Sequence, residues 1–202
     1  MDAGLQRALY GVAAELQLLA FESDITQIYE ADLRAAMRRS LHVATGRRVV
    51  PEAKIAIPTW PRAGTVDIAV RSAKGSGWDA LVELKVWKQP SKVFETGWDA
   101  WKLASAYKAN IGWRVYLVAA GPESTWRGEV PGLAYWKGVT LRAPDAWAEI
   151  ASWPSTKPTE LPAGIKTHSL DPVAIHTPRG EDWHVGAIRI STTSGRPWKP
   201  TS

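Results

Sequence analysis

Three charged residues, Asp67, Glu83 and Lys85, interrupt two runs of sequence that otherwise have the apolar character of β-strands. Side chains alternate between the two faces of a strand, so Glu83 and Lys85 emerge on the same face. Charged groups in such a setting are costly to bury unless they are paired or bind a metal. If residues 72–77 close a hairpin, Asp67 lies beside Glu83, and a divalent cation such as Mg²⁺ would relieve the repulsion between the two carboxylates.

The tripeptide Glu-x-Lys carries little information by itself, because chance produces it often in a chain of this composition. A second copy, Glu52-Ala53-Lys54, occurs here without a suitable Asp in a strand before it, and Pro51 weakens its own strand. The prediction at Glu83 therefore depends on its apolar setting, on Asp67 and on the order of the surrounding elements.

Two helices are expected before these strands. Apolar residues recur every three or four positions over residues 5–19, which is typical of one face of an amphipathic helix. A second amphipathic helix is predicted over about 24–42, with Asp24 as N-cap, Gln27 completing a capping box, and Gly46 as the stop.

The remaining pattern predicts an α/β fold with a central mixed β-sheet flanked by helices. Strands are expected at 48–57, 65–71, 79–87 and 111–119, and helices at 91–109 and 144–153. Pro51 places the first strand at an edge or a bulge. Residues 1–153 are interpreted as one α/β domain and residues 154–202, rich in Pro, Ser and Thr, as a C-terminal extension packed on it. Within that extension only 173–176 and 184–190 have the character of strands.

In these residues and their order the chain resembles the PD-(D/E)xK nuclease superfamily. That restriction-endonuclease-like core is a helix, three strands, a helix and a further strand (α-β-β-β-α-β), and the resemblance covers about residues 24–119. It implies that Asp67 and Glu83 bind Mg²⁺ or Mn²⁺ together with the backbone carbonyl of Leu84, with Glu30 of the first core helix joining them. It also implies that Lys85 orients or helps to activate the attacking water and stabilises charge on the phosphate.

The helix after the third strand carries a looser match, because family members often have Gln or Lys there, followed by Leu and later Tyr. Lys102, Leu103 and Tyr107 fit this pattern, although Lys102 stands where Gln is more usual. A second departure is Val66, which precedes Asp67 in place of Pro. Neither departure concerns a metal ligand, so both bear on the subfamily more than on the chemistry.

The function implied is metal-assisted hydrolysis of phosphodiester bonds in a nucleic acid, with DNA as the expected partner. Lys102, Lys88, Arg47 and Arg48 are the expected substrate contacts, and the formal net charge of +5 is compatible with such a partner. Many nucleases of this type cut two strands by dimerising, so the resemblance raises a homodimer as well.

Several alternatives remain open at the level of sequence. Glu83 and Lys85 can form an ion pair on a solvated sheet, and Glu30 can pair with Arg34 four residues later on its helix. The 12 Trp residues, against 2 Phe, can fill the core or present stacking platforms. A non-catalytic nucleic-acid-binding or protein-interaction protein on a nuclease-like fold is the alternative function.

Some classes of site and location are disfavoured by composition. The chain has no Cys, so disulfides and thiolate metal sites are excluded. No apolar run approaches the roughly 20 residues that span a bilayer, and the N-terminal helix lacks the features of a secretory signal. A cytoplasmic protein without membrane contact is therefore expected.

Overall fold

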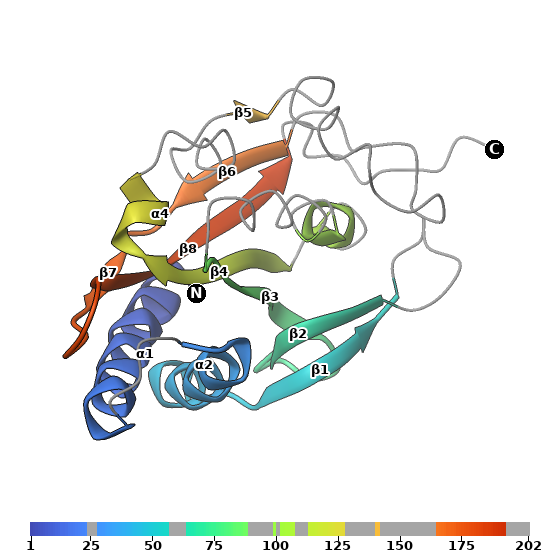
Figure 1. Ribbon diagram of the computed structural model, residues 1–202. Helices are drawn as coiled ribbons and strands as arrows, with labels where there is room; N and C mark the ends of the chain where they lie inside the picture. Colours follow the sequence, from blue (N-terminus) through green and yellow to red (C-terminus); the bar gives the residue numbers. More distant parts are fainter. Residues whose placement is uncertain are drawn as a thin grey trace.

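A mixed β-sheet forms the centre of the molecule in the computed structural model, which describes residues 1–23, 28–56, 64–88, 99, 102–107, 113–127, 140–141 and 165–192 (Figure 1). Within these residues the sheet has eight strands, of which seven follow the order β1-β2-β3-β4-β8-β6-β5, and β7 pairs with β8 beside that path. The strands are β1 (Val49–Ile55), β2 (Gly64–Arg71), β3 (Trp78–Val86), β4 (Arg114–Pro122), β5 (Thr140–Leu141), β6 (Ile165–Ser169), β7 (Val173–Ile175) and β8 (Trp183–Thr192).

Strand directions make the sheet mixed. β1, β2 and β3 are antiparallel neighbours, β3 and β4 are parallel, and β4 and β8 are antiparallel. The expected mixed α/β architecture is therefore confirmed, with β1 at one edge as Pro51 predicts. β6 and β8, from the segment interpreted as an extension, continue the same sheet beyond β4.

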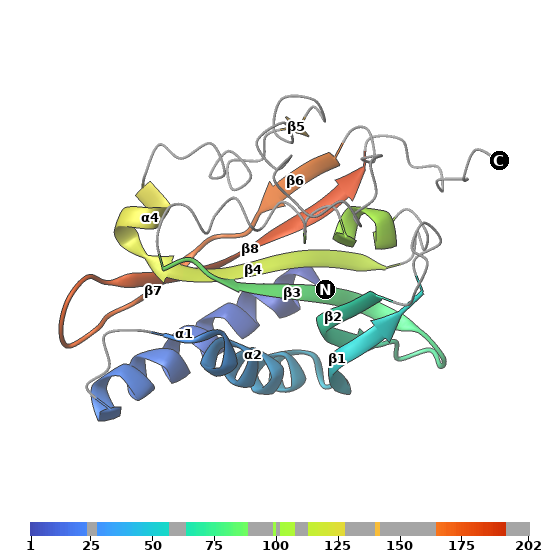
Figure 2. The ribbon, with the colours of Figure 1, turned by 45° about the vertical axis from the view of Figure 1, so that its right-hand side comes forward.

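Helices α1 (Asp2–Ser23) and α2 (Glu30–Thr45) pack side by side against one face of the sheet (Figures 1 and 2). One hydrophobic cluster joins them to the alternate residues of β2, β3, β4 and β8 that point toward them, including Ile68, Val82 and Leu84. The helical residues 102–107 lie on the opposite side of the sheet, as both views show. None of the helices in the described ranges is long and apolar enough to cross a bilayer.

The start of α2 differs from the sequence expectation. The helix begins at Glu30 rather than near Asp24, and residues 24–27, with the predicted capping box, lie outside the described residues. Tyr29 is the N-cap, and its backbone N–H donates to the Asp32 carboxylate at 2.9 Å. The predicted stop is confirmed, because Gly46 adopts a left-handed conformation with φ of 64° that glycine tolerates.

Other elements are matched in part. β4 begins at Arg114, three residues later than expected, and the helix predicted over 91–109 is described only at residue 99 and at 102–107. The helix predicted over 144–153 lies outside the described residues. The short helix α4 (Glu123–Arg127), β5 and β6 had no counterpart in the sequence prediction. Trp87 and Trp183 are buried, which supports the core interpretation for these two residues.

Candidate functional site

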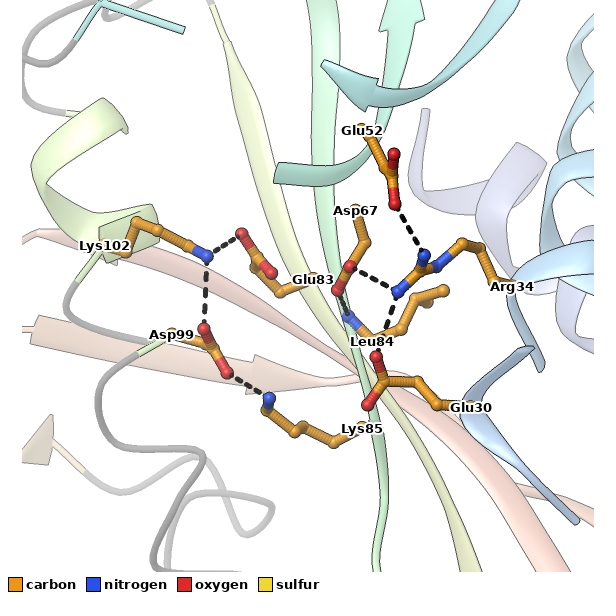
Figure 3. Close-up of polar contacts among 9 residues, drawn as sticks. All are labelled: Glu30, Arg34, Glu52, Asp67, Glu83, Leu84, Lys85, Asp99 and Lys102. Carbon is orange, nitrogen blue, oxygen red and sulfur yellow. Dashed lines mark hydrogen bonds and ion pairs between the residues drawn. The ribbon is translucent and has the colours of Figure 1, made fainter. Parts of the chain in front are cut away.

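The Asp67 carboxylate ties β2 to the backbone of β3 at the centre of the candidate site. Ile68 and Val82 are register partners in this antiparallel hairpin. Asp67, one residue before Ile68, therefore lies near Glu83 and Leu84, which follow Val82. Its Oδ2 accepts a hydrogen bond from the backbone N–H of Leu84 at 2.8 Å (Figure 3). Because Leu84 stands between Glu83 and Lys85, this bond fixes the Asp67 carboxylate against the segment that carries the other two charged residues.

Glu83 and Lys85 belong to a chain of ion pairs on the face of β3 opposite to α1 and α2. The Lys102 ammonium contacts the Glu83 carboxylate and lies 3.2 Å from Asp99 Oδ1. Asp99 Oδ2 in turn lies 2.9 Å from Lys85 Nζ. Figure 3 shows Lys102 and Asp99 approaching β3 from the side of the 102–107 helix. Four charged residues from two elements thus neutralise one another in sequence along a largely buried path.

Burial dominates the chemistry of Glu83, which is 3% exposed. Desolvation disfavours the ionised carboxyl, and although Lys102 opposes this effect, the carboxylates of Asp99 and Asp67 add to it, so the pKa of Glu83 is raised well above its ordinary value. An additional cation at this point would stabilise the ionised form of Glu83.

Lys85 is held as a cation. Burial alone would lower its pKa, but the Asp99 carboxylate, through its charge and its hydrogen bond, outweighs that effect and raises the pKa of the Lys85 ammonium. A lysine in this state is a fixed positive charge and a hydrogen-bond donor, and it cannot accept a proton at neutral pH.

Arg34 of α2 closes the other side of the site. Its guanidinium lies 3.1 Å from Glu30, 3.0 Å from Glu52 and 3.2 Å from Asp67, measured between the nearest nitrogen and oxygen atoms. The expected pair of Glu30 with Arg34 is therefore formed, and it is part of a larger cluster (Figure 3). Glu52 reaches this cluster from a left-handed backbone conformation with φ of 47°, which is uncommon for a residue other than glycine.

Asp67 and Glu83 offer the carboxylate oxygens that Mg²⁺ prefers. Within the described ranges no group of three or more His, Cys, Asp or Glu side chains is assembled to hold a metal ion, so water and backbone oxygen would have to complete the coordination. Glu83 Oε1 is buried in its ion pair with Lys102, and Asp67 Oδ1 pairs with Arg34, so these two cations now stand beside the carboxylates.

The expected substrate contacts lie at different places. Lys102 is in the buried chain of ion pairs rather than at the rim. Lys88 lies over the Tyr29 ring, 4.1 Å from its centroid. Arg47 pairs with Asp79 near the start of β3, about 13 Å along the strand from Glu83 at the usual rise per residue. Arg48 lines a cleft beside α2.

The sequence interpretation missed Asp99, and it missed the contacts of Arg34 with Glu52 and Asp67. Asp99 stands three residues before Lys102, a spacing that places both side chains on one face of a helix. That spacing was a usable signal for an acidic partner of Lys102. No comparable spacing in the sequence indicated that Arg34 contacts Glu52 and Asp67 as well as Glu30, because these residues lie on three separate elements.

The chain matches no known protein-family model, no curated protein and no solved structure.

Proposed function

We propose that this chain is a divalent-metal-dependent nuclease that hydrolyses phosphodiester bonds in DNA on a restriction-endonuclease-like core. The observation that carries the proposal is the hydrogen bond from the Leu84 amide to Asp67, at 2.8 Å. It holds the Asp67 carboxylate against the backbone between Glu83 and Lys85, and two carboxylates with an ammonium are the groups that the proposed metal-assisted hydrolysis would use.

Asp67 and Glu83, with the backbone carbonyl of Leu84, would hold Mg²⁺ or Mn²⁺, and Glu30 is the additional acidic residue at the rim. When bound, the metal would supply a water of lowered pKa and polarise the phosphate. Lys85, kept positively charged by Asp99, places a fixed positive charge where negative charge develops on the phosphate oxygens. Asp99 is then a positioning residue, because it acts through Lys85.

Arg34 and Lys102 have a second role in this proposal. Each lies against one of the two carboxylates, so each compensates negative charge that would otherwise be buried without a partner. A metal ion would share or replace this compensation. The Lys102 ammonium would then pair mainly with Asp99, which it already contacts at 3.2 Å.

The same two cations favour a second candidate function. A protein that has these carboxylates permanently neutralised by Arg34 and Lys102 needs no metal, and it could bind nucleic acid or a protein partner without catalysis. The two functions differ in one measurable respect, because only the nuclease would show a dependence of DNA cleavage on divalent cations.

The test is cleavage of plasmid, linear duplex and single-stranded DNA, and of RNA, with Mg²⁺, Mn²⁺ or EDTA. The parent is compared with Asp67→Asn, Glu83→Gln and Lys85→Met, which preserve shape while removing charge. Removing one of these charges should lower the rate about 10²-fold or more. Lys74→Met, at an exposed position in the hairpin turn, is the matched control and should cleave like the parent.

Metal-dependent cleavage of DNA that is lost in the three site variants and retained in the control would support the proposal. Absence of cleavage by a folded parent in Mg²⁺ and in Mn²⁺, together with metal-independent binding of nucleic acid, would instead support the non-catalytic function.

A further inference from the structure

A stripe of polar residues, three of them charged, runs along α2 away from the candidate site. Glu30, Arg34, Arg38 and His42 are spaced four residues apart, so they follow one another on the same side of the helix. β1 lies beside this stripe. At one end Arg34 contacts Glu52 of β1 at 3.0 Å, and at the other the His42 ring nitrogen Nδ1 lies 2.7 Å from the Arg47 carbonyl oxygen, just before β1 begins.

The outer half of this stripe lines a cleft between α2 and the start of β1. The cleft has a volume of about 610 Å³, and its described lining residues are Ala35, Arg38, Arg39, His42, Arg48 and Val49. Three arginines are among these lining residues, and we call the hollow the basic cleft.

Two of these three arginines have no carboxylate partner. Arg39 pairs with Glu15 of α1. Within the part of the chain that the structure describes, no acidic side chain pairs with Arg38 or Arg48, and both residues are exposed. A concave surface with two uncompensated guanidinium groups attracts a polyanion, since Arg binds phosphate through its planar fork of donors.

Negative charge predominates on the α2 side of the candidate site, in contrast to the basic cleft. There Glu30, Glu52 and Asp67 share the single guanidinium of Arg34. A phosphate approaching these three carboxylates is repelled unless the rest of its strand is held by positive charge close by. The basic cleft supplies this charge from Arg38, one turn beyond Arg34 on α2, and from Arg48, just before β1.

We propose that the basic cleft binds the phosphodiester backbone of duplex DNA and directs it toward the Asp67–Glu83 site. The proposal rests on the nuclease function proposed above and names where the uncut flank of the substrate lies. Arg34 and His42 are eight residues apart on the helix, or about 12 Å, which corresponds to three or four phosphates at 3.4 Å of axis per nucleotide in one strand.

The lining also favours a duplex over a single strand. Proteins that bind single strands place bases on Trp, Tyr or Phe rings, and none of these residues is among the described lining of the cleft. A surface of guanidinium groups and small apolar residues contacts backbone and leaves the bases stacked inside the helix.

The experiment measures binding of a fluorescently labelled DNA duplex by anisotropy over a series of salt concentrations. EDTA is present throughout, so that cleavage does not interfere. The parent is compared with Arg38→Gln, Arg48→Gln and the double variant. The matched control is Lys74→Gln/Arg114→Gln, which removes the same charge from two exposed positions outside the cleft. Thermal unfolding followed by circular dichroism checks that all variants fold.

Each cleft substitution should reduce the slope of log K against log salt by about 0.9 and weaken binding about eightfold at 0.1 M salt, while the control binds like the parent. The proposal is overturned if the double variant keeps the parental slope, if the parent binds no duplex, or if it prefers single-stranded DNA or RNA. Reduced slopes in a chain that never cleaves DNA with Mg²⁺ would retain the basic cleft and reject the nuclease. Cleavage of DNA by a protein whose cleft variants keep the parental slope would support the nuclease and reject the basic cleft as its DNA-binding surface.

Discussion

At the scale of single residues, the site is governed by the cost of burying charge. The Lys102 and Glu83 side chains are 10% and 4% exposed, so each has lost most of its hydration and depends on its partner. Removing one member of such a pair costs far more than removing a pair on the surface, because the remaining charge stays buried. Arg39 and Glu15 provide the comparison within the same chain, since the Arg39 side chain is 62% exposed.

Lys102→Met should therefore lower the free energy of unfolding by about 3–5 kcal/mol, measured by urea denaturation. The double variant Lys102→Met/Glu83→Gln should recover part of that loss, because it leaves no uncompensated carboxylate. Arg39→Met, at the exposed pair, should cost about 1 kcal/mol or less. A loss in Lys102→Met as small as that in Arg39→Met would show that Glu83 does not depend on this ammonium.

A second prediction concerns pH. The folded protein raises the pKa of Glu83 above the ordinary value of 4.5, chiefly through burial, so the folded state binds this proton more tightly than the unfolded chain does. The stability associated with this group is complete below pH 4.5 and is lost as the pH rises toward the folded pKa. Glu83→Gln mimics the protonated form, so the stability of the parent relative to this variant should fall as the pH rises above 4.5. A difference that stays constant as the pH is raised from below 4.5 would contradict the raised pKa.

At the scale of elements, α1 is fastened to the sheet at its first turn. Asp2 accepts a hydrogen bond from the Tyr116 hydroxyl of β4, and Arg189 of β8 donates to the same carboxylate at 2.5 Å. A carboxylate at this end of a helix also interacts favourably with the free N–H groups. The contact therefore joins α1 to two neighbouring strands of the sheet.

Asp2→Asn should lower the free energy of unfolding by about 0.5–1 kcal/mol near neutral pH, a small effect because the Asp2 side chain is 39% exposed and solvent screens the pair. Burial acts to raise the pKa of Asp2, but Tyr116 and Arg189 outweigh it and lower the pKa. The difference from the parent should therefore be present above pH 3.8 and vanish as the pH falls through the lowered folded value. Asp171→Asn, at an exposed side chain, is the control. An equal loss of unfolding free energy in that control would show that the contacts of Asp2 add no stability.

The elements also show how far sequence reasoning could reach. Alternation of apolar and charged residues was sufficient to place Asp67, Glu83 and Lys85 on adjoining strands, because strand periodicity is a local property. The partners of these residues were harder to predict. Asp99 meets Lys85, and Arg34 meets Asp67, only after the chain has folded. The short strands β5 and β6 lack the strong alternation that identifies strands in isolation.

At the scale of the whole molecule, the position of β8 determines which segments fold together. Eight of its residues are in register with β4, and Val185, Ala187, Ile188 and Ile190 are buried. β8 therefore occupies the interior of the sheet, between β4 and β6, although it is formed from residues 183–192.

Residues 1–153 alone, the predicted domain, should consequently fail to show a cooperative urea transition, because β4 would lose one of its two partner strands and the core would lose these apolar side chains. Co-expression with residues 154–202 should restore protection from trypsin, and the intact chain is the positive control. A sharp transition and protease resistance in the isolated 1–153 fragment would show that the N-terminal part folds independently.

The late position of β8 in the chain has a consequence for protein synthesis. A ribosome delivers β3 and β4 well before residues 183–192, so for that interval the nascent chain carries β4 with one row of backbone N–H and C=O groups unpaired. An apolar strand with an open edge pairs readily with other chains. Slow translation between residues 122 and 183 should therefore increase aggregation, whereas the finished chain covers the edge with its own C-terminal strand.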